Sequence, residues 1–180
     1  MHLVGSASTT STTSTTPLSR EAYKLMCNGE RQRDAEGYRL RAAGVCIRGL
    51  GKDLEVLLVT TVKSSGSKDP SQLPPPRKWV VPGGGVEKDE DASAAAVREL
   101  EEEAGVRAET GTQIGVFADH ERKHRTTVFV MDVKEELPVW EDNIQIGRER
   151  AWMNVDEAIA CVKDRHITIL LAAKDLLSKQ

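Results

Sequence analysis

The sequence predicts one domain that mixes helices and strands in an α+β or α/β/α layered fold. Its 180 residues are enough to bury a core, and 39% hydrophobic and 29% charged residues are ordinary for a globular protein. Strand-like and helix-like patterns follow one another along the chain, which indicates layers of both kinds. No apolar run approaches the ~20 residues of a membrane span, and the N-terminus lacks the apolar stretch of a secretory signal, so we expect neither.

The N-terminal 30 residues differ in composition from the rest. Gly5–Ser19 is rich in Ser and Thr and has no apolar periodicity, so it cannot bury enough surface to offset the entropy of ordering. We therefore predict a disordered tail over residues 1–30 and a folded domain over residues 31–180. The run also lacks the arginines of an organelle-targeting peptide, which disfavours that role.

Four segments have the apolar and β-branched pattern of strands. They are Arg41–Gly49, Leu54–Val62, Thr112–Ala118 and Arg125–Val133. The first two are joined by the turn Leu50–Asp53. A surface loop rich in Pro, Ser and Gly is predicted at Lys63–Arg77.

Three segments are predicted helices: Asp91–Ala104, Val155–Asp164 and Ile167–Ser178. The first has the most complete set of signals, because Asp91 suits an N-cap, alanines fill the interior and Gly105 suits the C-terminal end. The last is amphipathic and should pack one face on the sheet.

Charge and cysteine content narrow the function classes. The three cysteines lack CxxC spacing, which indicates reduced thiols and a cytosolic or nuclear compartment rather than a disulfide framework. A net charge of −3 argues against bulk attraction to nucleic acid or to an anionic membrane. Two basic segments, Arg20–Arg48 and Glu121–Arg125, nevertheless stand out beside an acidic helix. That contrast is typical of a metal-assisted enzyme acting on a small polyanion.

The acidic helix has a spacing that predicts a metal site. Glu99, Glu102 and Glu103 share one helical face, so three carboxylates should converge and repel one another unless a cation neutralises them. Hard oxygen ligands suit Mg²⁺, with Mn²⁺ or Zn²⁺ as alternatives. We expect Arg98 to project elsewhere and to pair with Glu90. The preceding loop Val81–Glu87 contains three glycines, which let the backbone approach a ligand or offer a carbonyl oxygen.

These residues belong to a longer pattern of fixed spacing. Its positions are Gly84, Glu90, Arg98, Glu99, Leu100, Glu102, Glu103, Gly105 and Val106. The pattern resembles the Nudix box in every specified position. The resemblance implies a Nudix-type α/β/α sandwich with a mixed, curved sheet, and a hydrolase that cleaves a diphosphate.

Segments outside the box are similar to the diphosphoinositol polyphosphate phosphohydrolases, a Nudix subfamily. They are GYRLRAAGVCIR, RKWVVPGGGVE, ERKHRTTVFV and WEDNIQIGRERAW, and together the similarity covers residues 31–163. The resemblance implies hydrolysis of diphosphoinositol polyphosphates, and also of diadenosine polyphosphates and inorganic polyphosphate. We expect a monomer whose partner is this small polyanionic substrate.

The resemblance also assigns roles to residues. It implies that Glu102 is the general base and that Glu99, Glu103 and the Gly83 carbonyl hold the metal. The phosphate-binding positions fall on Arg31, Arg39, Arg41, Arg122, His124 and Arg148. Lys63 stands where the family has an arginine and is a further candidate phosphate ligand, which supplies charge without the bidentate geometry of arginine. His166, next to Arg165, replaces a late family lysine. Two alternatives stay open: Arg148 bridging Glu141 or Asp142, and His124 packing as a loop histidine.

Two other functions compete with this one. A nucleotide or RNA-cap pyrophosphatase of the same fold would need an aromatic clamp for a base, and aromatic residues make up only 4% of the chain. A catalytically silent phosphate-binding module is disfavoured because the full glutamate set is present.

Overall fold

The computed structural model of the chain describes residues 31–61 and 78–179. The predicted tail over residues 1–30, the predicted loop Lys63–Arg77 and the candidate phosphate ligand Lys63 lie outside the described residues. Among the helices of the described part, none is both long enough and apolar enough to cross a membrane.

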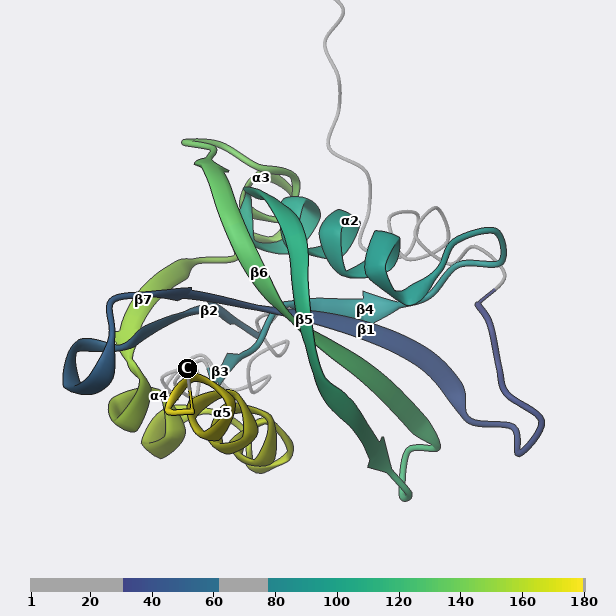
Figure 1. The fold of residues 1–180 in the computed structure, drawn as a ribbon. Helices are drawn as coiled ribbons and strands as arrows, with labels where there is room; N and C mark the ends of the chain where they lie inside the picture. Colours follow the sequence, from purple (N-terminus) through teal and green to yellow (C-terminus); the bar gives the residue numbers. More distant parts are fainter. Residues whose placement is uncertain (1–30, 62–77, 180) are drawn as a thin grey trace, which may run out of the picture.

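A mixed, open sheet forms the centre of the fold (Figure 1). Its strands in the described part are β1 (Arg39–Arg48), β2 (Glu55–Thr60), β3 (Trp79–Val80), β4 (Gly83–Gly85), β5 (Val106–Asp119), β6 (His124–Glu136) and β7 (Arg150–Asn154). Five strands follow the order β3-β2-β1-β6-β5, while β4 pairs with β1 and β7 pairs with β2. The pairing of β1 with β6 is parallel and the other pairings between these strands are antiparallel, which confirms the predicted mixed sheet.

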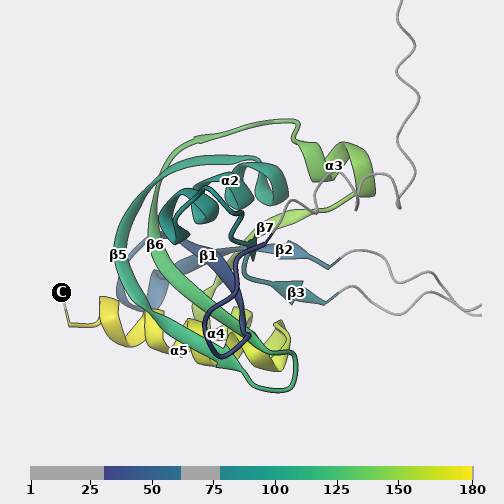
Figure 2. The same ribbon diagram turned by 90° about the vertical axis from the view of Figure 1, so that its right-hand side faces the viewer.

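Helices cover both faces of the sheet, as predicted for an α/β/α sandwich. One face carries α2 (Ala92–Ala104) and α3 (Glu141–Ile146), and the other carries α4 (Val155–Cys161) and α5 (Asp164–Leu177) (Figure 2). Strand β1 contributes to both cores because successive side chains alternate: Ala42 and Cys46 pack with α2, whereas Ala43 and Val45 pack with α5. Figure 2 also shows β5 and β6 curving around α2, so the sheet is curved as predicted.

The parallel register of β1 and β6 brings the two basic segments together. Arg39 is the Cα partner of His124, and Arg41 is the partner of Thr126. Strand β4 pairs with β1 on the other side, with Gly83 opposite Ala43. Residues far apart in sequence therefore meet at the N-terminal half of β1.

The ends of α2 confirm the capping prediction. The Asp91 carboxylate accepts a hydrogen bond of 2.8 Å from the Ala94 amide, which satisfies one of the unpaired donors of the first turn. Gly105 ends the helix in the left-handed region at φ 62°, where a glycine has no Cβ to clash. These two signals fix the helix that carries the glutamates.

Other boundaries differ from the prediction. The glycine segment predicted as a loop forms β4, while α3 and β7 are elements that no pattern predicted. A run of three glycines has no side-chain alternation, and helices or strands of five or six residues are too short to show a period. Strand β5 begins at Val106 rather than Thr112, because register shifts against β6 interrupt its alternation.

Candidate active site

Two of the three glutamates on helix α2, Glu99 and Glu102, lie around Arg98. The Arg98 guanidinium donates to Glu90 at 2.6 Å, to Glu99 at 3.1 Å and to Glu102 at 3.2 Å. It also donates to the Gly85 carbonyl at 3.0 Å, so it ties the helix to the glycine strand. The predicted pairing with Glu90 is confirmed. The expectation that Arg98 projects away from the cluster is wrong, since it lies between two of its carboxylates.

Glu99 is packed directly against the glycine strand. Its residue exposure is only 6%, and a Cβ built on Gly84 would lie 1.9 Å from Glu99 Oε1. Only a glycine at this position leaves room for that carboxylate. The glycine of the box is therefore required here by space rather than by a special backbone angle.

Glu103 faces away from Arg98 and is held by other groups. It accepts a hydrogen bond of 2.8 Å from the Gly83 amide and pairs with Arg148 at 2.8 Å. Arg148 in turn lies 2.9 Å from Asp142 and is only 8% exposed. The alternative in which Arg148 bridges Asp142 is thus what the contacts show, and direct contact of Arg148 with substrate stays a prediction.

Burial raises the pKa of all three carboxylic acids. It raises the pKa of Glu102 to about 7, with Arg98 opposing the shift. Burial also raises the pKa of Glu99 against the opposing charge of Arg98, and that of Glu103 against Arg148. The neighbouring arginines therefore do not fully compensate the cost of burying these charges.

The kind of atom that these residues offer to a cation indicates which metal would suit them. Three carboxylates and the Gly83 carbonyl offer oxygen only, which fits Mg²⁺ or Mn²⁺ better than Zn²⁺, whose sites favour nitrogen and sulfur. The expected convergence on one volume is not seen: in the described part of the chain, no three His, Cys, Asp or Glu side chains are grouped to hold a metal. Glu99 and Glu102 pair with Arg98, whereas Glu103 turns to Arg148.

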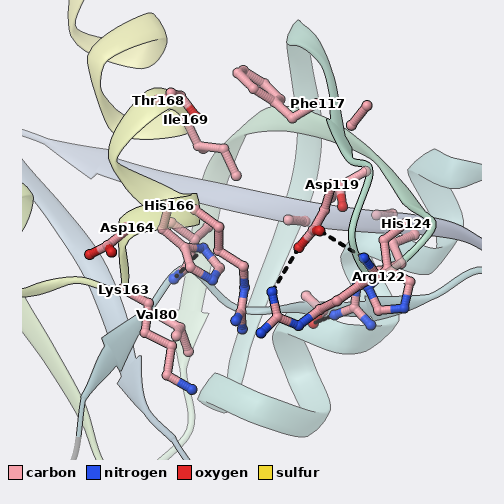
Figure 3. A pocket seen from close by; sticks show the side chains of 18 of the residues that line it. Val80, Phe117, Asp119, Arg122, His124, Lys163, Asp164, His166, Thr168 and Ile169 are labelled. Atoms are coloured by element: carbon pink, nitrogen blue, oxygen red, sulfur yellow. Dashed lines mark hydrogen bonds and ion pairs between the residues drawn. The ribbon is translucent and has the colours of Figure 1, made fainter.

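A cleft of about 930 Å³ adjoins Glu103 and Gly83 (Figure 3). We call it the basic cleft after the basic residues in its lining: Arg41, Arg122, His124, Arg148, Lys163, Arg165 and His166. These come from β1, the β5–β6 turn, the segment before β7 and the N-terminal end of α5. Acidic groups in the lining include Asp119, which pairs with Arg122 at 3.1 Å.

The basic residues are close enough to affect one another. Burial lowers the pKa of Arg41, and burial followed by the charge of Arg41 lowers the pKa of His124. Burial likewise lowers the pKa of Arg165, with the charges of Arg122 and Arg41 adding to the effect. Mutual repulsion of this kind is relieved when an anion binds among the cations.

The predicted phosphate-binding residues of the described part fall into two groups, one inside the basic cleft and one beside it. Arg41, Arg122, His124 and Arg148 line the basic cleft. Arg31 and Arg39 lie beside it, near Glu99, and the Arg31 guanidinium packs against Gly85. Sequence reasoning did not assign Lys163 and Arg165 to the site; the only signal was that Arg165 precedes His166, where the resemblance expects a lysine.

A second depression lies on the other side of the glutamates. We call it the apolar groove; its nonpolar lining is Ala94, Val97, Leu137, Val139, Trp140 and Ile144. Arg98 and Glu102 also line it, so Glu102 borders the groove while Glu103 borders the basic cleft. The Trp140 indole donates to the Glu103 carbonyl at 2.9 Å and is covered by Arg150 at 4.6 Å.

Comparisons with known proteins show which family the sequence matches. The NUDIX domain family matches residues 38–172. Mouse diphosphoinositol polyphosphate phosphohydrolase 2 is 45% identical over 150 residues, covering 82% of this chain and 77% of the relative. The mouse 3-alpha form is 44% identical over 151 residues, covering 82% of this chain and 85% of the relative.

Solved structures support the fold alone. A mutT/nudix family protein from Listeria innocua has a TM-score of 0.54 and 23% identity, covering 83% of this chain and 97% of its own. The solution structure of the E. coli ORF135 protein has a TM-score of 0.55 and 22% identity, covering 82% and 97%.

Proposed function

The chain belongs to the Nudix hydrolase family, and from that premise we propose that it hydrolyses the phosphoanhydride of diphosphoinositol polyphosphates with the help of a divalent cation. The curated relatives carry that substrate in their names and match most of the chain. The alternative of a catalytically silent binding module is not favoured, because the glutamate set of the box is complete.

The observation that carries the proposal is the contact between the basic cleft and the glutamate set. Glu103 lines the cleft together with Gly83, whose amide it accepts a hydrogen bond from. A substrate with its diphosphate near these two residues would therefore have its other phosphates in the cleft. An inositol ring crowded with phosphates needs several cations around it, and arginine suits this task because its planar fork binds phosphate oxygens in pairs.

In the proposed reaction, Glu102 removes a proton from water while the water oxygen bonds to phosphorus. The phosphorus–oxygen bond of the anhydride breaks, which releases phosphate and the remaining polyphosphate. A pKa of about 7 suits a base that must both take and release a proton near neutral pH. The Arg41 guanidinium donates to the Gly83 carbonyl at 2.8 Å and thereby orients it.

The cation would be held by Glu99, Glu103 and the Gly83 carbonyl, and we propose Mg²⁺, with Mn²⁺ or Zn²⁺ as substitutes. When bound, such an ion polarises the diphosphate and neutralises charge that develops on its oxygens. Two protein features support this assignment. The donor atoms are all oxygens, and burial raises the pKa of Glu99 and Glu103 despite the neighbouring arginines, so a cation would stabilise their charged forms.

With the diphosphoinositol activity we also propose hydrolysis of inorganic polyphosphate, which offers the same phosphoanhydride bond. A second candidate activity is that of a nucleotide or RNA-cap pyrophosphatase, acting on substrates such as diadenosine polyphosphates. The apolar groove favours this nucleotide activity, because Trp140 and neighbouring aliphatic side chains lie next to Glu102 and offer a nonpolar surface to a nucleobase. A nucleotide substrate would then place its nucleobase in the apolar groove and its polyphosphate over the three glutamates.

We also propose that the protein acts as a monomer in the cytosol or nucleus. Of the five large exposed apolar residues of the described part, three lie on different elements: Leu50 precedes β2, Val116 lies on β5 and Leu171 on α5. The other two, Val139 and Ile144, both border the apolar groove. The described cysteines, Cys46 and Cys161, are free thiols, as expected in a reducing compartment.

The test compares substrates and variants side by side. Arg122→Ala should lower kcat/KM about tenfold to a hundredfold on a diphosphoinositol polyphosphate, and less on diadenosine polyphosphate, which offers fewer charges per unit area. Arg107→Ala is the matched control, because Arg107 is an exposed arginine that pairs with Glu101 and Glu135 outside the cleft. Equal losses on both substrates in a stable variant would favour the nucleotide activity instead.

A further inference from the structure

The turn between β5 and β6 and the first residue of β6 carry two of the basic residues that line the basic cleft. Arg122 and His124 both belong to the segment Asp119–His124, and Figure 3 shows their side chains at the cleft beside Asp119. The Arg122 side chain is 56% exposed, and Lys123 has a positive φ of 53°, unusual for a residue with a side chain. A turn of this kind needs outside contacts to hold a single conformation.

Three contacts fasten this turn to the segment that leads into β1. The Tyr38 hydroxyl is hydrogen-bonded to His120 Nδ1 at 2.7 Å, and the Arg39 amide donates to the Lys123 carbonyl at 2.7 Å. Arg125, just after the turn, pairs with Asp34. The second contact is between main-chain atoms and the third is an ion pair. Tyr38 meets the tip of the turn through its side chain alone: its hydroxyl bonds His120, and the Lys123 ammonium lies 5.5 Å from the centre of its ring.

Tyr38 is itself held rigidly. Its exposure is 9%, its ring meets the His120 ring edge-on with centroids 5.9 Å apart, and Arg125 covers its face at 4.6 Å. Tyr38 directly precedes Arg39 and lies three residues before Arg41. Its hydroxyl therefore connects the strand that carries one set of cations with the turn that carries the other.

We propose that Tyr38, acting through His120, is a positioning residue that sets how the β5–β6 turn presents Arg122 and His124 to a polyanionic substrate. Tyr38 does not line the cleft, while His120 does. The proposal rests on the proposed function, since it assumes that phosphates bind in the basic cleft. It adds a residue that affects substrate affinity without contacting the substrate or the reacting atoms.

The expected effect follows from the strength of one hydrogen bond. Tyr38→Phe keeps the ring, its packing and the stacking with Arg125, and removes only the hydroxyl. Loss of one partly buried hydrogen bond should loosen the turn and raise KM by about threefold to tenfold, with kcat unchanged because Glu102 is not involved. A substitution that damages the whole fold would instead lower kcat and the melting temperature together.

The experiment uses two readouts on the full chain. Titration calorimetry measures the Kd for inositol hexakisphosphate, a polyanion without a diphosphate to cleave, alongside KM and kcat on a diphosphoinositol polyphosphate. Hydrogen–deuterium exchange measures the opening of residues 119–125 without any ligand. Ser93→Ala is the matched control, because it removes a hydroxyl bonded to Thr110 at a similar 2.8 Å between α2 and β5, outside the cleft.

Several results would support the proposal together. Tyr38→Phe and His120→Ala should each raise Kd and KM about threefold to tenfold and speed exchange in the turn, while the double variant should be no worse than either single one. His120→Gln, whose amide still offers a hydrogen bond to the phenol, should recover most of the affinity. Ser93→Ala should leave both readouts unchanged.

Other results would overturn it. Tyr38→Phe with wild-type affinity and wild-type exchange in the turn would mean that the hydroxyl positions nothing. An equal effect of Ser93→Ala would show that the change reflects general loosening. If the wild-type chain neither binds inositol hexakisphosphate nor turns over the inositol substrate, the proposed function fails, and the exchange measurement alone then decides whether Tyr38 holds the turn.

Discussion

Gly84→Ala is the substitution whose effect the packing of α2 predicts most directly. The added Cβ would lie 1.9 Å from Glu99 Oε1 and 2.1 Å from Glu99 Cδ, whereas ordinary contacts begin at 3.4 Å. The Glu99 carboxylate must therefore move by about 1.5 Å, and a misplacement of about 1 Å at a catalytic group can cost on the order of 10²-fold in rate. We expect kcat to fall by about a hundredfold or more.

The stability cost should be moderate. Inserting one methyl group into a well-packed site costs about 1–3 kcal/mol, which in a domain of this size lowers the melting temperature by several degrees. Steady-state kinetics together with a thermal melt separate the two effects. Gly115→Ala is the control glycine, because its Cβ would meet only the Phe117 ring at an ordinary 3.5 Å.

A double variant tests the mechanism of the loss. If Gly84→Ala acts by displacing Glu99, then adding it to Glu99→Ala should cost little further activity and should restore stability, since the clash is gone. A Gly84→Ala enzyme with kcat within threefold of the parent would refute this reasoning. So would losses that simply add in the double variant.

Two further predictions concern Glu102 and His166. Glu102→Gln should keep the melting temperature and lower kcat by on the order of 10²-fold or more, as expected for loss of a general base; hydrolysis within threefold of the parent would remove that role. Burial lowers the pKa of His166 to about 3, below its value in the unfolded chain, so the unfolded state takes up the proton first as the pH falls. The stability contributed by neutral His166 is thus complete above pH 6.5 and lost progressively towards pH 3. Compared with His166→Asn by chemical denaturation, the wild type should lose up to about 1.4 kcal/mol more per pH unit between pH 6 and 4, and parallel curves would contradict this.

The sequence predicts α2 better than any other part of the site. Asp91, the alanines and Gly105 are local signals, and the structure has the helix with those ends. Helix capping depends on neighbours three or four residues away, so it can be read without knowing the rest of the fold.

The other half of the site depends on contacts that no local pattern contains. That Arg148 is buried between Glu103 and Asp142 follows from the packing of α3 against α2, and α3 itself has no visible period. Lys163 and Arg165 enter the cleft only because α5 packs across the sheet with its N-terminal end towards Arg41. Predicting these neighbours requires the tertiary arrangement as well as the spacing of residues.

The parallel pairing of β1 with β6 has a consequence for the order of folding. His124 follows Arg39 by 85 residues, and closing a loop of that length costs entropy before any contact rewards it. The glutamates sit on α2, whose partners include the adjacent strands β4 and β5, whereas the basic cleft also needs α5, the last helix of the described chain. Pulse-labelled hydrogen exchange during refolding should therefore protect α2 before α5. A chain emerging from the ribosome would therefore expose the glutamates of α2 well before Lys163 and Arg165, the residues that complete the basic cleft.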